Sequence, residues 1–146
     1  MKTILRLSLL LAALAGLVAT AHAASASLEG ILITASNEPG QTDRRLAQYE
    51  PTLRRILRFE SYQYVGSDRA NLGVPASGSL SLGDGHEVEV ATEKSEGGAV
   101  HVKVRWTAGG RTLMNTGLVL RAGVPAVLGG PSTGKGGVYA VILVGR

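Results

Sequence analysis

Apolar and polar residues follow two different periods along this chain, and the change between them divides the sequence. A run over 28–36 is apolar and rich in β-branched side chains, which predicts a buried strand. From Asp43 to Leu57 apolar residues recur at helical spacing, and the side chain of Thr42 or Asp43 can cap the first turn. Because Pro51 lies inside this pattern and removes a backbone hydrogen bond, we expect a kink or two short helical pieces.

The rest of the chain is dominated by strand and turn patterns. The aromatic and β-branched segment 59–65 completes a strand–helix–strand unit over 28–66, and the polar, Gly- and Pro-bearing residues 67–77 predict a loop. Over 78–146 the central runs alternate strictly, and their connections are short and Gly-rich. The sequence therefore predicts an α+β, mainly β fold. We expect an antiparallel β-sandwich or partial barrel, preceded by the strand–helix–strand unit with one amphipathic helix.

The alternation also predicts a pairing register for two of these strands. With a hairpin loop over 94–98, Val90 faces Val102 on one side of the sheet, and Glu89 faces Lys103 on the other. Apolar residues then meet apolar residues and acids meet bases, whereas a slip by one residue would reverse every side chain. The even-numbered side chains of these strands should form the core wall: Val88, Val90, Val100, Val102, Val104, Trp106, Met114, Leu118 and Leu120.

The first 23 residues have the composition of a secretory signal peptide. Lys2 and Arg6 introduce an almost wholly apolar stretch, which ends in the small-x-small triplet Ala21-His22-Ala23. That stretch falls short of the roughly 20 residues that span a bilayer, and an uncleaved anchor is the alternative. We expect cleavage after residue 23, one β-rich domain over 24–146 without a transmembrane segment, and a periplasmic or secreted location.

Charge and composition narrow the range of partners. The chain has 15 Lys and Arg against 11 Asp and Glu, and removal of Lys2 and Arg6 leaves 13 against 11, a balance that does not favour nucleic acid. The absence of cysteine excludes disulfides, thiolate metal sites and a cysteine nucleophile.

The run 129–136 has the spacing G-x-x-x-x-G-K but lacks the following Ser or Thr and precedes a strand pattern. We predict a hairpin loop there, no nucleotide and no cofactor.

Two clusters of residues carry candidate chemistry. Asp84, His86 and Glu87 gather two carboxylates and an imidazole at a turn, a set that suits a metal ion or a general base. The alternative is a polar hairpin corner, because Gly-Asp-Gly is a common turn composition. No G-x-S-x-G elbow for a serine nucleophile is present.

The second cluster is basic and aromatic. Arg54, Arg55 and Arg58 flank the apolar stripe of the predicted helix and suit contact with anionic envelope components, although a solvated helix face gives the same pattern. Tyr62 and Tyr64 share one face of the predicted strand. Such a pair could stack on a sugar ring or a peptide, or it could close the core over the helix.

The run from Leu118 to Val144 resembles the late strand pairs of secretin-type outer-membrane proteins, which points to envelope machinery. Because no catalytic constellation outweighs its structural alternative, while the sheet face and the helix carry segregated charge, we expect an exported, non-enzymatic β-rich binding or structural module of a bacterial-type cell envelope. Its partner would be an envelope protein or glycan, or a second copy. One alternative is an accessory subunit of an outer-membrane secretion or pilus system. Another is a small metal-dependent hydrolase that uses Asp84, His86 and Glu87.

Overall fold

The computed structural model describes residues 25–146, and the signal peptide predicted over 1–23 lies outside them. Eight strands, one 3₁₀ turn and one helix make up this part of the chain. The strands are β1 (Ser25–Ser36), β2 (Ser61–Gly73), β3 (Ala76–Gly83), β4 (His86–Glu96), β5 (Ala99–Ala108), β6 (Arg111–Arg121), β7 (Ala126–Ser132) and β8 (Gly137–Gly145). The 3₁₀ turn η1 (Arg44–Leu46) and helix α1 (Glu50–Leu57) lie between β1 and β2.

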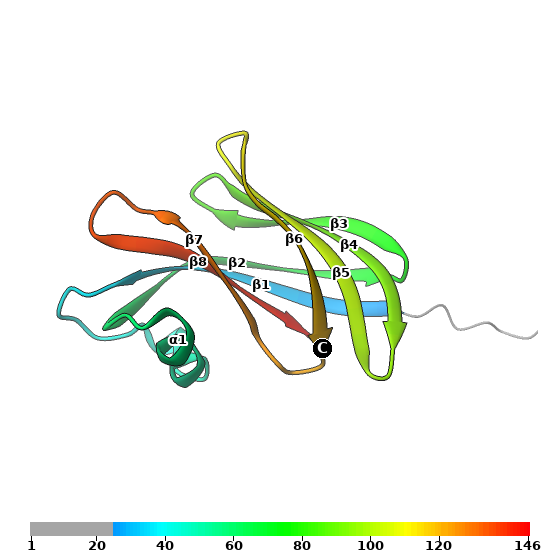
Figure 1. Ribbon diagram of the computed structural model, residues 1–146, viewed down its shortest axis with the longest axis horizontal. Coiled ribbons are helices and arrows are strands. Elements are labelled where there is room, and N and C mark those ends of the chain that lie inside the picture. Colours follow the sequence, from blue (N-terminus) through cyan, green and yellow to red (C-terminus); the bar gives the residue numbers. More distant parts are fainter. Residues whose placement is uncertain (1–24) are drawn as a thin grey trace, which may run out of the picture.

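The strands form two antiparallel sheets that pack face to face (Figure 1). Sheet A has the order β2-β1-β8-β7, and sheet B has the order β3-β4-β5-β6. The predicted mainly β sandwich is therefore confirmed. The first strand does not stand apart from the sandwich, because β1 pairs along its length with both β2 and the last strand, β8.

Sheet A is covered on both faces where α1 lies over it, which explains why β8 and the middle of β1 (30–33) are continuously apolar. Leu32 and Val141 point into the core between the two sheets, whereas Ile33 and Ile142 belong to a second core under α1. The molecule therefore has three layers over part of its length: the helix, sheet A and sheet B (Figure 1).

Sheet B is covered on one face only, and its strands alternate accordingly. The predicted β4–β5 register is wrong by two residues, because Val90 faces Val104 and Glu89 faces Arg105. Ala99 pairs with Glu96 rather than with Glu93, and an irregularity between Thr92 and Lys94 offsets one residue of this three-residue difference. Since a shift of two keeps each side chain on its face, most of the predicted core wall is buried: Val88, Val90, Val102, Val104, Trp106 and Leu120. Val100, Met114 and Leu118 are half-buried.

The prediction of a loop over 67–77 is also wrong. β2 continues to Gly73, paired with β1, and β3 begins at Ala76. Residues in this half of β2 are polar because they lie on an edge strand. Gly66 is required there, since a Cβ at this position would collide with the carbonyl oxygen of Leu82 on β3. The two sheets therefore close against each other along the β2–β3 edge.

The predicted split in the helical segment is confirmed. Asp43 Oδ1 accepts from the N–H of Arg45 at 3.0 Å and caps η1, whereas α1 has Pro51 in its first turn, where no intrahelical donor is needed. Leu53 is fully buried against sheet A. Within residues 25–146, no helix is both long enough and apolar enough to cross a bilayer.

Candidate functional site

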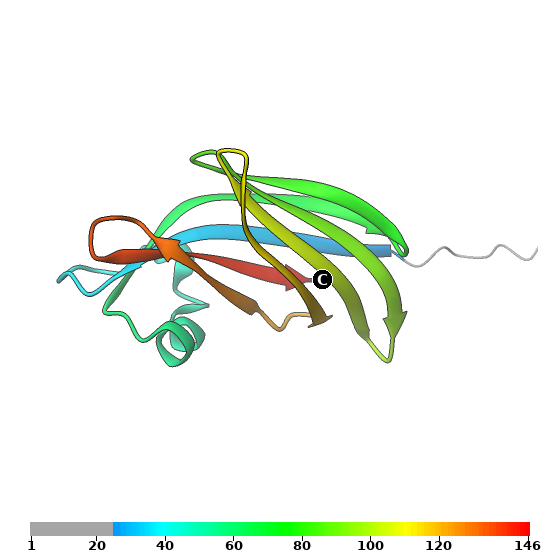
Figure 2. The ribbon, with the colours of Figure 1, turned by 45° about the horizontal axis from the view of Figure 1, so that its top comes forward.

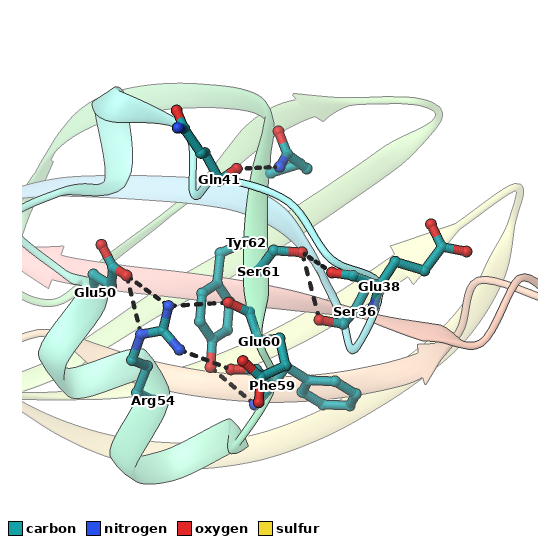
Figure 3. A network of polar contacts seen from close by, with 10 residues as sticks. Ser36, Glu38, Gln41, Glu50, Arg54, Phe59, Glu60, Ser61 and Tyr62 are labelled. Atoms are coloured by element: carbon teal, nitrogen blue, oxygen red, sulfur yellow. Dashed lines mark hydrogen bonds and ion pairs between the residues drawn. The ribbon is translucent and has the colours of Figure 1, made fainter.

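Arg54 ties helix α1 to the beginning of β2. Its guanidinium donates to Glu50 Oε1 at 2.8 and 3.0 Å, and to the carbonyl oxygens of Glu60 at 2.9 Å and Phe59 at 3.5 Å (Figure 3). The bond to the Glu50 carboxylate raises the pKa of Arg54 above its ordinary value. Its donors are thus engaged within the molecule, and Arg54 has a structural role.

Arg45 is engaged in a similar way at the other end of the helical segment. It pairs with Asp43 at 2.8 Å, and its guanidinium carbon lies 3.9 Å from the ring centroid of Tyr64. The side-chain hydrogen bond from Arg45 is the main reason that the pKa of Asp43 falls from 3.8 to about 2. This cluster fixes the entry into η1.

Arg55 and Arg58 are different, because both are exposed and neither has a carboxylate within 4.0 Å among residues 25–146. Between them lies Ile56, which is 47% exposed. We call these three residues the arginine patch. Arg58 ends the helix in the left-handed conformation, with φ of 57°, and so directs the chain away from α1 toward β2.

The two tyrosines do not form a shared surface. Tyr62 is fully buried, and its hydroxyl accepts from the N–H of Phe59 at 3.1 Å. It closes the core over the helix, which is one of the two alternatives that the sequence left open. Tyr64 is half-buried under Arg45 and shares a 2.7 Å hydrogen bond with Ser67. A direct contact with a partner is therefore open to Tyr64 but not to Tyr62.

The turn at Asp84, His86 and Glu87 does not assemble a site. His86 is buried, and its Nδ1 accepts from the indole N–H of Trp106 at 3.0 Å. Burial lowers the pKa of His86, against a smaller opposite effect of Asp84. Glu87 is exposed and follows His86 on the strand, so it points to the opposite face. Across residues 25–146, no three His, Cys, Asp or Glu side chains come together as a metal site.

The hairpin loop predicted over 129–136 is shorter in the structure and spans residues 133–136 between the last two strands. β7 extends through Ser132, and the hairpin closes with a hydrogen bond of 2.9 Å from the N–H of Thr133 to the carbonyl of Gly137. Since β8 follows directly, no helix N-terminus is present in this part of the chain to hold a phosphate.

Comparisons of the chain with protein-family models, with curated proteins and with solved structures find no match.

Proposed function

We propose that this protein is an exported, non-enzymatic binding module of the cell envelope, and that its arginine patch binds anionic lipid headgroups. The observation that carries the proposal is the exposure of Ile56, next to Arg55 and two residues before Arg58 in the sequence, together with the lack of a carboxylate within 4.0 Å of either arginine in the described chain. Export rests on the signal-like composition of residues 1–23.

The chemistry of the patch suits a phosphate-rich surface. A guanidinium group donates two parallel hydrogen bonds to a phosphate, which makes arginine well suited to headgroups. An apolar side chain beside it can enter the boundary between headgroups and acyl chains. With two turns, α1 is too short for tight insertion, so the expected contact is peripheral and reversible.

The non-enzymatic part of the proposal rests on His86. The nitrogen that would act as a base accepts a hydrogen bond from Trp106 inside the core. Glu87 lies on the opposite face of the strand, and within residues 25–146 no three His, Cys, Asp or Glu side chains come together as a site.

Co-sedimentation of the mature protein with vesicles tests the proposal. We expect binding to vesicles of phosphatidylglycerol mixed with phosphatidylcholine, and little binding to phosphatidylcholine alone. Each Arg→Gln change at Arg55 or Arg58 should weaken binding about fivefold at low salt. Arg111→Gln is the matched control, because Arg111 is an exposed arginine on a distant strand.

Two results would overturn this function. One is equal binding to both kinds of vesicle, which would remove the electrostatic basis. The other is a loss of binding in Arg111→Gln as large as that in Arg55→Gln. This result would show that the net charge of the protein, rather than the arginine patch, determines vesicle binding.

A further inference from the structure

A hollow of about 430 Å³ is bordered by strand ends and loops of sheet A. At this end of the sandwich the ribbon of sheet A extends past sheet B (Figures 1 and 2). Its lining comes from the end of β1, the beginnings of β2 and β8, and the two loops that flank them. This volume is within the range of sites for small molecules, and the hollow is separate from the arginine patch.

Two rows of paired residues make the floor of the hollow. In the first row, Thr34 of β1 pairs with Gln63 of β2 and Tyr139 of β8, so the three side chains share one face of sheet A. The second row pairs Ser36 with Ser61 and Gly137. Gly137 is required in the second row, because a Cβ there would lie 2.5 Å from the carbonyl oxygen of Ala35.

Hydrogen bonds hold one wall in place. The wall runs from Glu38 to Gly40, and its backbone is fixed to the floor by two serines. The N–H of Glu38 donates to Ser36 Oγ at 2.9 Å, and Ser61 Oγ donates to the Glu38 carbonyl at 3.2 Å (Figure 3). Thr133 and Lys135 of the β7–β8 loop line the hollow as well.

Several polar groups on the floor have bonding capacity left. Within residues 25–146, the hydroxyls of Thr34 and Tyr139 have no hydrogen-bond partner. Gln63 donates from Nε2 to the Gln41 carbonyl at 2.9 Å. Its Oε1 has no hydrogen-bond partner in the described part of the chain. The two hydroxyls both donate and accept, and the amide oxygen accepts. All three groups are neutral.

The aromatic ring in the floor is held from behind. Tyr139 packs on the imidazole of His86, with ring centroids 4.6 Å apart, and His86 is itself held by Trp106. A rigid, half-buried ring next to neutral hydroxyl and amide groups suits a sugar. A sugar offers an apolar ring face for stacking and hydroxyls that both donate and accept.

We infer that this hollow binds a mono- or disaccharide, with Thr34, Gln63 and Tyr139 as its contacts. The charged residues Glu38 and Lys135 line the hollow but are exposed to solvent. The neutral groups occupy the floor. Their chemistry therefore favours a neutral sugar over a zwitterion, a ligand that carries both a positive and a negative charge.

Chemical-shift mapping on the ¹⁵N-labelled mature protein tests this site. The probes are glucose, galactose, mannose and N-acetylglucosamine, together with their common disaccharides, each at up to about 10 mM, which is about tenfold above a Kd of about 1 mM. At least one sugar should shift the amide signals of Thr34, Gln63 and Tyr139. Thr34→Val and Tyr139→Phe each remove one hydroxyl and should weaken that binding about three- to tenfold.

The controls separate a sugar site from other outcomes. Thr112→Val, an exposed threonine on β6, should leave the affinity unchanged. The inference fails if no sugar shifts these signals at the highest concentration, or if the shifts map to another face. Dialanine serves as a zwitterionic probe. The inference also fails if dialanine binds in place of the sugars and if Glu38→Gln or Lys135→Gln abolishes its binding, because the hollow would then be a site for a zwitterion.

Discussion

Trp106 donates its indole N–H to Nδ1 of His86 at 3.0 Å, and both side chains are buried between the sheets. This bond requires a neutral imidazole, because a protonated His86 would direct a second N–H at the indole donor. The pair therefore links the protonation of one side chain to the packing of the sandwich. It also supports the ring of Tyr139 in the hollow.

The first prediction concerns pH and stability. Burial lowers the pKa of His86 from its ordinary 6.5, so the unfolded chain binds this proton more readily than the folded chain. The free energy of unfolding should be at its full value above pH 6.5 and should fall as the pH drops below it. Urea titrations between pH 5 and 8 measure this dependence. They avoid the acid range in which Asp43, with a pKa of about 2, becomes protonated.

Two variants assign the effect to one residue. His86→Gln can still accept from the indole and should flatten the pH dependence. His101→Gln, on the half-exposed strand position of β5, should retain it. A pH dependence that persists in His86→Gln would show that another group is responsible.

The second prediction separates the structural arginine from the patch. Arg54→Gln removes the donors that join Glu50 to the carbonyl of Glu60, so its melting temperature should fall by a few degrees. Arg55→Gln should melt like the unmodified protein, because no carboxylate in the described chain pairs with Arg55. Equal melting temperatures for the two variants, measured by circular dichroism, would contradict this division.

The third prediction concerns the closed edge of the sandwich. Gly66→Ala places a methyl group against the carbonyl oxygen of Leu82, and either strand must move, so we expect a loss of about 3 kcal/mol or more. Gly117→Ala on β6 is the matched control, since the nearest atom to its added Cβ would be the Val102 carbonyl oxygen at 3.9 Å. It should be neutral or stabilising by about 0.5 kcal/mol. Similar unfolding midpoints in urea for Gly66→Ala and Gly117→Ala would count against the close approach of β2 and β3.

Local pattern predicted most of the fold, because alternation, helical spacing and caps are properties of neighbouring residues. Asp43 caps η1 as one of two predicted candidates, and β4 and β5 keep the predicted faces. The polar end of β2 was predicted as a loop since its partner, β1, is distant in sequence. Its closeness to Leu82 is set by the packing of the two sheets, which no local pattern encodes.

The candidate site was harder to predict for the same reason. Both faces of the Tyr62 strand carry apolar residues, so the sequence did not distinguish a buried tyrosine from an exposed one. The hollow depends on the alignment of Thr34 with Tyr139, residues on strands at opposite ends of the chain. Of the three arginines predicted for partner contact, Arg55 and Arg58 are exposed and Arg54 is hydrogen-bonded within the fold, and contact with a partner stays a prediction.

Site-directed photo-crosslinking in intact cells tests the central claim most directly. A benzophenone side chain replaces Ile56 in one variant and Val119 in another, because Val119 is 51% exposed on β6, well away from α1. We predict adducts with anionic lipid from position 56, identified by mass spectrometry, and none from position 119. Lipid adducts in equal yield from both positions, or only protein adducts from position 56, would contradict the claim.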